Sequence, residues 1–261
     1  MQIRDLLDLE KIIYYTYSIL YVLTLNYCTF SIPSVYIKCQ EKGMKNLENN
    51  ISRREREKQA RKIEIINAAE DLFFADGFEN TSMDVIAKKA QFTKRTLYQY
   101  FINKEDLFYA VVLRGVEQLD QYFRKALDNG KTALEKIRLS NRAFYQFYKD
   151  HPITFRMIYY KPSNNSNRDA SPHYQEIMRM QDLTFQNYAA VIEGGKKDGS
   201  IRNDLDAKKA AHFAIFSTIG FLIDMSDIND AYWKKYNLEK EDFILFSCDL
   251  LADSVSSKLK P

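Results

Sequence analysis

Residues 81–107, TSMDVIAKKAQFTKRTLYQYFINKEDL, are the stretch that decides the fold of this chain. Three short helical segments follow one another in it. Thr81, Thr93 and Asn103 each stand where an N-cap side chain accepts a hydrogen bond from the backbone of the first helical turn. The first two segments are too short to be stable alone. We therefore expect them to pack on a neighbouring helix.

That neighbouring helix is predicted directly upstream. Ser52 and Glu55 have the spacing of a capping box. Gly77 is the expected end, because glycine readily takes the left-handed conformation in which many helices stop. Between these points, apolar residues recur at helical spacing and predict one buried face: Ile63, Ile66, Ala69 and Phe73.

The middle segment, residues 93–101, is dense in polar side chains. It carries hydroxyls, an amine, a guanidinium and a phenol on Thr93, Lys94, Arg95, Thr96 and Tyr98. These groups suit phosphate oxygens and base edges. An ordinary solvated helix face can have the same composition. The position of the run, directly after a short capped helix, favours a helix-turn-helix that binds DNA.

Residues 56–115 resemble the DNA-binding domain of the TetR family of transcriptional regulators. Three motifs carry the resemblance: Phe-x-x-x-Gly-Phe/Tyr within 73–78, Ile-Ala-x-x-Ala at 86–90, and Leu-Tyr-x-Tyr/His-Phe-x-x-Lys-Glu-x-Leu at 97–107. The family usually has Gly-Val-Ser at the turn, where this chain has Gln91-Phe92-Thr93. Gln91 must therefore adopt a backbone angle that glycine takes freely.

The segment 93–101 is expected to enter the major groove. We assign base or phosphate contacts to Lys94 and Arg95, and phosphate positioning to Tyr98, Tyr100 and Lys104. The full predicted set of DNA contacts is Thr81, Ser82, Thr93, Lys94, Arg95, Thr96, Tyr98, Gln99, Tyr100 and Lys104.

Composition limits the remaining classes of function. The 261 residues are 46% hydrophobic and include only eight Gly and five Pro, which favours helices around a substantial core. The formal net charge is +3, and residues 51–104 alone hold eleven Lys/Arg against eight Asp/Glu. The excess positive charge therefore lies in this segment, as expected for a DNA-binding end on a neutral body.

Nothing in the sequence indicates catalysis. Cys28, Cys39 and Cys248 have neither metal-ligand nor disulfide spacing, which is typical of a reducing cytoplasm. The three histidines lie far apart in the sequence. We expect no enzyme activity, no cofactor and no metal site, and a cytoplasmic location.

Residues 1–43 are a separate question. Residues 12–37 contain no charge and are long enough to span a bilayer. A signal peptide is disfavoured because acidic residues precede the apolar run. The favoured interpretation is that translation starts at Met44, since the codons of residues 41–43 resemble a ribosome-binding site. A soluble appended helix is a third reading. The alternative function is a membrane-anchored sensor that uses residues 12–37 as its span.

The rest of the chain predicts an all-α protein of about nine helices. A DNA-binding domain is expected at residues 44–104 and a ligand-binding and dimerisation domain at residues 105–261. One helix from Asn103 to Asn129 would be about 40 Å long. Further helices are expected at 132–149, 152–160, 171–193, 206–225 and 239–257, with a polar loop at 161–170 and Gly194-Gly195 as a stop.

Aromatic residues gather in the middle helices. The resemblance implies a small-molecule pocket there, and plain core packing is the alternative at each single position. Tyrosine and phenylalanine suit flat or lipophilic ligands. The predicted pocket residues are Phe144, Phe147, Tyr148, Phe155, Tyr159, Phe185 and Tyr188.

The last two helices are expected to pair with those of a second subunit, as the resemblance implies; a core within one chain is the alternative. The predicted interface is Ala210, Ala214, Ser217, Phe221, Phe243, Leu250 and Leu251. Together these expectations describe a homodimeric repressor that binds a palindromic operator in double-stranded DNA. A small-molecule effector would release it by moving the helix that starts at Asn103.

Overall fold

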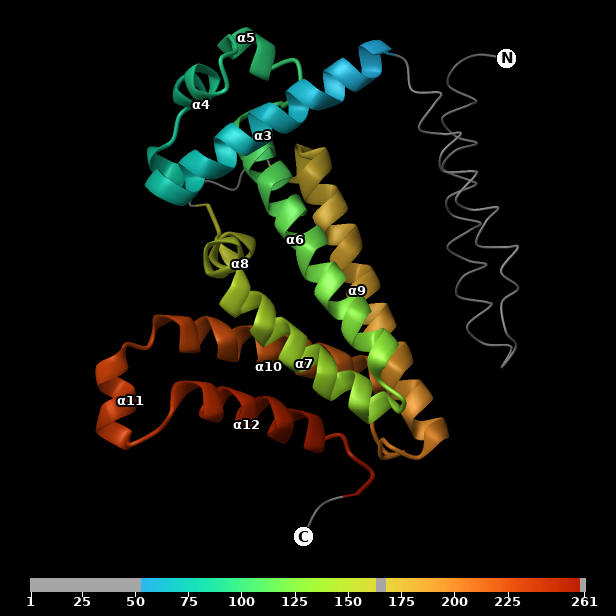
Figure 1. The fold of residues 1–261 in the computed structure, drawn as a ribbon. Helices are drawn as coiled ribbons and strands as arrows, with labels where there is room; N and C mark the ends of the chain where they lie inside the picture. Colours follow the sequence, from blue (N-terminus) through green and yellow to red (C-terminus); the bar gives the residue numbers. More distant parts are fainter. Residues whose placement is uncertain (1–52, 163–167, 259–261) are drawn as a thin grey trace, which may run out of the picture. The chain divides into compact units, whose positions relative to one another are not determined.

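The computed structural model describes residues 53–162 and 168–258 (Figure 1). Regular structure in these ranges is helical, which confirms the all-α prediction: ten α-helices, a 3-10 turn at Arg168–Ala170, and one isolated bridge between Ile201 and Ser256. The chain divides after Lys58 into two units. Of the first, only the opening turns of α3 are described. The expectations for residues 1–43, Met44 and Ser52 lie outside the described residues.

The N-terminal helices form a small head. Helix α3 (Arg53–Asn80) is interrupted at Gly77, whose φ of 77° and ψ of 166° are not helical, as expected for the predicted end. Helices α4 (Met83–Lys89) and α5 (Lys94–Leu97) follow. The buried face of α3 is centred on Ile65, Ala69 and Phe73, whereas Ile63 is exposed, so the predicted apolar stripe is rotated.

The helices from α6 onward form the body. Helix α6 (Lys104–Asn129) also contributes its first turns to the head. Its N-cap is Asn103, as predicted, whose side chain accepts a hydrogen bond from the Asp106 amide at 2.8 Å. The first three turns are almost wholly buried, because apolar residues occupy every side of them. Gly115 allows close packing there, since a Cβ at this position would lie 2.6 Å from the Thr154 side chain.

Helices α7 (Ala133–Asp150) and α8 (Pro152–Tyr159) follow as predicted. Thr132 and Glu135 form a complete capping box at the start of α7. Helix α9 (Pro172–Asp198) differs from the expectation, because it runs through Gly194-Gly195 and ends at Gly199 in the left-handed region. Gly195 has a packing role instead: a Cβ there would lie 2.5 Å from Ile201.

The C-terminal part contains one helix that was not predicted from the sequence. Helices α10 (Ala207–Asp227) and α12 (Lys240–Asp253) match the predicted pair, and α11 (Asp230–Tyr236) lies between them. Asn229 caps α11, and Trp233 is its only buried residue. At seven residues, α11 is too short for a clear helical repeat, which is why it was overlooked.

In Figure 1, α6 and α9 lie side by side, and α10 and α12 run alongside each other with α11 connecting them. Helix α12 is fixed to α7 by polar contacts: Asn141 Nδ2 donates to the Cys248 carbonyl at 3.1 Å, and Arg142 pairs with Asp249 at 2.8 Å. Among the described helices, none alone has the length and apolar content of a membrane span; α10 and α11 together pass that test but are bent by 100°.

Candidate DNA interface and ligand pocket

Helices α4 and α5 have the geometry of a helix-turn-helix. Ser82, rather than the predicted Thr81, is the N-cap of α4 and accepts a hydrogen bond from Val85. Thr81 is buried, and its hydroxyl donates to the Gly77 carbonyl at 2.8 Å. Its side chain therefore closes the α3–α4 connection and does not lie on the exposed surface to which it was assigned.

The turn between the two helices depends on Gln91. Its φ is 59°, in the left-handed region. This was predicted because Gln91 stands where the family usually has glycine. The Gln91 amide donates to the Lys88 carbonyl and the Phe92 amide to the Ala87 carbonyl. A residue other than glycine therefore holds the same kind of turn.

Thr93 caps α5 as predicted and accepts a hydrogen bond from the Thr96 amide at 3.1 Å. The regular helix is shorter than the expected 93–101, but hydrogen-bonded turns continue to Phe101, whose amide donates to the Leu97 carbonyl. Leu97 and Phe101 are buried. Six of the assigned contact residues are exposed: Ser82, Thr93, Lys94, Arg95, Tyr98 and Gln99.

The remaining assigned residues are less accessible. Thr96, Tyr100 and Lys104 are half-buried. The Lys104 ammonium donates to the Phe78 carbonyl at 2.9 Å and lies 4.1 Å from the centroid of the Phe78 ring. Lys94 pairs with Asp84 across the two helices at 2.7 Å. Arg95 has no ion pair with another described residue, so its charge is free to meet an anion.

A buried polar cluster lies next to residues 101 and 102, which follow α5. It consists of Asp106 on α6 and Ser171 and His173 at the start of α9, and we call it the Asp106 cluster. Asp106 Oδ1 lies 2.6 Å from Ser171 Oγ and 2.7 Å from His173 Nδ1, and Oδ2 accepts from the Ile102 amide at 3.1 Å. The His173 ring also lies 5.7 Å from that of Phe101.

The Asp106 carboxylate is stabilised in its charged form. Burial alone raises the pKa of a carboxyl group, but the hydrogen bonds from His173, Ser171 and Ile102 outweigh it, and the pKa of Asp106 lies below its ordinary value. The cluster therefore joins α9 to the loop that follows α5 through charge-assisted hydrogen bonds.

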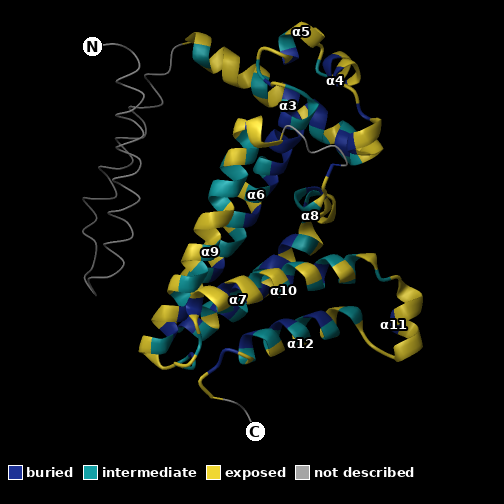
Figure 2. Ribbon diagram, turned by 180° about the vertical axis from the view of Figure 1, so that it is seen from behind, coloured by how far each residue is buried: buried dark blue, intermediate teal, exposed yellow. Residues whose placement is uncertain are grey.

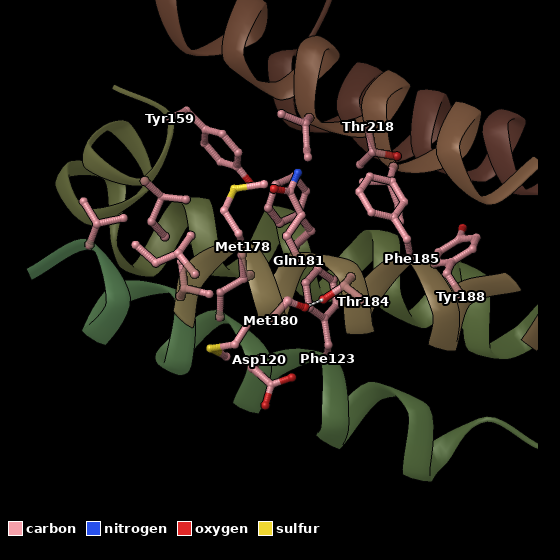
Figure 3. Close-up of a pocket in the computed structure, with 18 of the residues that line it drawn as sticks. Asp120, Phe123, Tyr159, Met178, Met180, Gln181, Thr184, Phe185, Tyr188 and Thr218 are labelled. Atoms are coloured by element: carbon pink, nitrogen blue, oxygen red, sulfur yellow. Dashed lines mark hydrogen bonds between the residues drawn. The ribbon is translucent and has the colours of Figure 1, made fainter. Parts of the chain in front are cut away.

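A cavity of about 420 Å³ lies in the body. Its walls are mainly apolar and come from α6, α7, α8, α9 and α10 (Figure 3). In Figure 3, Met178, Gln181, Phe185 and Tyr188 project from α9 into the space that Tyr159 and Thr218 also face. This volume is within the usual range for small-molecule sites.

The cavity includes four of the seven predicted pocket residues: Phe144, Tyr159, Phe185 and Tyr188. Phe147 and Phe155 are buried in a cluster of residues from α6, α7, α8, α10 and α12, and Tyr148 packs against it, so these three residues lie outside the cavity lining. Burial raises the pKa of the Tyr159 and Tyr188 phenols above the ordinary tyrosine value, so both remain neutral donors.

Other cavity residues on α9 were not predicted from the sequence. Ile177, Gln181 and Thr184 line the cavity with the predicted Phe185 and Tyr188. Their spacing of three or four residues is the helical repeat of one face, and this repeat was the available signal. Lys161 and Arg168, at the ends of the predicted polar loop, also line the cavity.

Helices α10 and α12 both carry exposed positions (Figure 2), and several of these are large apolar residues. Phe213 and Phe216 on α10 are 59% and 57% exposed, and Phe246 and Leu250 on α12 are 62% and 59% exposed. Of the predicted interface, only Leu250 belongs to this most exposed set. Ala214 is buried and lines the cavity instead, while the partly exposed residues are Ala210, Ser217, Phe221, Phe243 and Leu251.

No group of three or more His, Cys, Asp or Glu side chains that could hold a metal ion occurs within residues 53–162 and 168–258. Cys248 is buried on α12, and burial raises the pKa of its thiol to about 11. A thiol in that form is a poor nucleophile.

Comparison with known proteins gives a consistent picture. Residues 65–111 match the model described as "Bacterial regulatory proteins, tetR family". The chain is 28% identical over 142 residues to the uncharacterized HTH-type transcriptional regulator YhgD of Bacillus subtilis strain 168. The aligned region covers 54% of this chain and 72% of that protein.

A second relative aligns over a longer region. The fatty acid metabolism regulator protein of Bacillus subtilis strain 168 is 26% identical over 188 residues, covering 70% of this chain and 90% of the relative. Among solved structures, a bacterial regulatory protein in the tetR family from Rhodococcus RHA1 has the same fold, with a TM-score of 0.56, 21% identity, and coverage of 75% and 97% of the two chains.

Proposed function

Because the chain belongs to the TetR family of transcriptional regulators, we propose that it is a homodimeric repressor that binds a palindromic operator and is released by a small-molecule effector. It would act by binding and not by catalysis. The main support is that one helix, α6, starts directly after the candidate DNA surface and also lines the cavity.

The proposed DNA surface is the exposed part of α4 and α5. Arg95 and Tyr98 are exposed at consecutive turns of the second helix, and Thr93 and Ser82 present hydroxyls beside them. Arg95 would contact a base edge, where guanidinium forms paired hydrogen bonds to guanine. Lys94 would contact a phosphate, at the cost of its surface ion pair with Asp84. Lys104, held at Phe78, would contribute less than we expected from the sequence.

The proposed dimer uses the exposed face of α10 and α12. Four large apolar side chains there are more than half exposed in the single chain, and contiguous apolar surface of this kind marks an interface. A twofold pair of these helices would form a four-helix bundle. Two heads related by the same axis would then contact two half-sites one helical turn apart.

The effector is proposed to be a largely apolar small molecule in the cavity. The walls consist mostly of aromatic and aliphatic side chains from five helices. The name of the relative in Bacillus subtilis, a fatty acid metabolism regulator, is compatible with such an effector. Effector binding would alter how α9 and α6 pack and thereby change the distance between the two heads.

A selection experiment tests the DNA-binding part of the proposal. The purified full chain is mixed with a random-sequence DNA library, and the retained DNA is sequenced after several rounds. We expect enrichment of one inverted repeat. Arg95→Ala should abolish the enrichment at one position of each half-site, while the control Lys197→Ala, an exposed lysine on α9, should leave it unchanged. Retention of DNA without any enriched sequence would contradict the proposal.

A further inference from the structure

The cavity is long and narrow. Helices α6 and α9 lie close together near their starts, where the rings of Tyr109 and Tyr174 are 5.0 Å apart, and α9 ends beside the start of α7, where Asp198 accepts a hydrogen bond from the Ala133 amide. Cavity residues occur from Phe108 to Leu127 on α6 and from Tyr174 to Val191 on α9. At 1.5 Å per residue, the lining stretch is about 28 Å long on α6 and about 25 Å long on α9.

This length limits the shape of the occupant. The lining residues are distributed along both helices, so an occupant that reaches both ends must be extended. A single extended chain fits such a space better than a fused ring system of the same volume. The methionines Met178 and Met180 also line it, and their unbranched side chains can adjust to a chain of variable conformation.

Charge divides the cavity into two different ends. Only three of its described lining residues carry a formal charge: Asp120, Lys161 and Arg168. Asp120 pairs with Arg124 at 2.6 Å, and in Figure 3 it lies at the edge of the group with its carboxylate directed away from the aromatic side chains. The two cations are therefore the charges available to a bound molecule.

Both cations lie at the end of the cavity next to the head. Lys161 follows Tyr160, whose hydroxyl donates to Glu79 of α3, and the Arg168 guanidinium lies 5.4 Å from the Tyr174 ring centroid. No ion pair joins Lys161 to another described residue. The acidic neighbour of Arg168 is Asp169, at 3.6 Å, with a side chain that is 83% exposed. Such a solvent-exposed pair is weak and leaves Arg168 able to bind another anion.

The opposite end carries no formal charge. Leu127, Ile137, Val191 and Ala214 line it. Its one distinctive polar atom is the Tyr188 hydroxyl, which is buried without a hydrogen-bond partner among the described residues. An apolar chain terminus fits this end, whereas a charged group there would be desolvated without a counterion.

We propose that the effector is a single-chain amphiphile with an anionic head group, a long-chain carboxylate, held with its carboxylate at Lys161 and Arg168 and its chain along α6 and α9 toward Ala214. This inference rests on the proposed function and names the ligand class of the same cavity. It excludes cationic amphiphiles, which would place like charges together, and it assigns Lys161 and Arg168 as specificity-determining residues.

The first test compares head groups by titration calorimetry with the full chain. Hexadecanoate should bind, and hexadecanol and hexadecyltrimethylammonium should bind at least about tenfold more weakly, since one charge-assisted contact is equivalent to about that factor. Lys161→Gln combined with Arg168→Gln should remove the preference for hexadecanoate over hexadecanol. The matched control Lys197→Gln should retain it.

The second test concerns the orientation of the chain. Ala214→Phe fills the uncharged end and should shift the preference from hexadecanoate to decanoate, whereas Tyr188→Phe should reduce the affinity for hexadecanoate less than the Lys161 and Arg168 double variant does. Equal binding of acid and alcohol by the wild type would overturn the proposal. So would a large loss in Tyr188→Phe together with no loss in the Lys161 and Arg168 variant, because the carboxylate would then lie at the other end.

Operator affinity measured without any probe separates the two claims. If operator binding is intact and hexadecanoate does not bind, the ligand class is wrong while the regulator function stands. If hexadecanoate binds as described but neither the wild type nor any variant binds a specific DNA sequence, the proposed regulator function is wrong. The proposed ligand site would still stand.

Discussion

At the scale of single residues, the turn at Gln91 determines how α4 and α5 meet. Its φ of 59° lies in a region that costs an L-amino acid about 1–2 kcal/mol relative to the right-handed conformation. Two hydrogen bonds of the turn hold the backbone in place. The chain therefore stores a small amount of strain at the centre of its proposed DNA interface.

The strain at Gln91 leads to a stability prediction. Gln91→Gly removes the left-handed penalty but makes the unfolded chain more flexible, and these effects nearly cancel at about 1 kcal/mol each. The unfolding free energy should change little or rise slightly. Gln91→Val should lower it by about 1–2 kcal/mol, because β-branched residues are least tolerant of this conformation. Denaturant unfolding of both variants checks this, and a Gly variant markedly less stable than Gln would contradict it.

The Asp106 carboxylate leads to a prediction on pH. Its pKa is depressed in the folded state, so its stabilising effect is complete above the unfolded value of about 4 and is lost as the pH falls through the folded value. At neutral pH, Asp106→Asn should lower the unfolding free energy by about 1–3 kcal/mol, since buried donors lose their charged acceptor.

The difference between wild type and Asp106→Asn should therefore shrink as the pH is lowered below about 4. Denaturant unfolding from pH 3 to pH 7 measures it. The control Asp182→Asn, an exposed residue of α9, should remain close to wild type throughout. A difference that is constant with pH would show that Asp106 does not act through its charge.

At the scale of elements, α9 joins the cavity to the head. Its residues Tyr174 to Val191 line the cavity, and its first turn supplies Ser171 and His173 to the Asp106 cluster. Those contacts reach Ile102, which directly follows the last turn after α5. A change in the position of α9 is therefore transmitted to the proposed DNA interface through few, well-defined hydrogen bonds.

A coupling prediction follows from this connection. His173→Ala should leave both effector binding and operator binding close to wild type, but the factor by which the effector weakens operator binding should fall toward one. Allosteric factors are typically about 5- to 150-fold. Operator affinity measured with and without hexadecanoate gives the factor. Gln186→Ala, exposed on the same helix, is the control; an unchanged factor in His173→Ala would contradict a role of the cluster in signalling.

The exposed face of α10 and α12 leads to a prediction on assembly. Phe216→Glu together with Phe246→Glu should convert a dimer into a folded monomer, because two charges would be buried in the proposed interface. Sedimentation equilibrium measures the mass. Ile153→Glu, which changes an exposed apolar residue on α8, should remain dimeric. A wild-type chain that is monomeric at all concentrations would remove the basis of the dimer model.

At the scale of the whole molecule, the sequence was most informative where the signals are local. The caps at Thr93 and Asn103 and the positive φ of Gln91 depend on a few neighbouring residues, and all three were predicted. The bounds of most main helices also follow from neighbouring caps and breakers, whereas α9 continues through the predicted stop at Gly194-Gly195.

Several differences from the prediction depend on contacts between distant segments. Phe147 and Phe144 are three residues apart on α7 and both belong to the buried cluster with α12, yet only Phe144 also lines the cavity. In the same way, Ala214 lines the cavity while Phe213 beside it is exposed. Helical spacing identifies a face but not its neighbour, so the sequence predicted a pocket, of which four of the seven named residues line the cavity, without indicating which neighbour each helix face contacts.

The central claim is that Arg95 and its neighbours on α5 contact DNA in a twofold-symmetric complex. Its most direct test is a titration of the selected inverted repeat and of a scrambled duplex with the full chain at several salt concentrations. Arg95→Ala should cost about 1–3 kcal/mol per half-site on the repeat, and Lys94→Ala should weaken both duplexes and make the log-log salt slope shallower by about two units per dimer. Unchanged affinity of both variants for both duplexes would contradict the account.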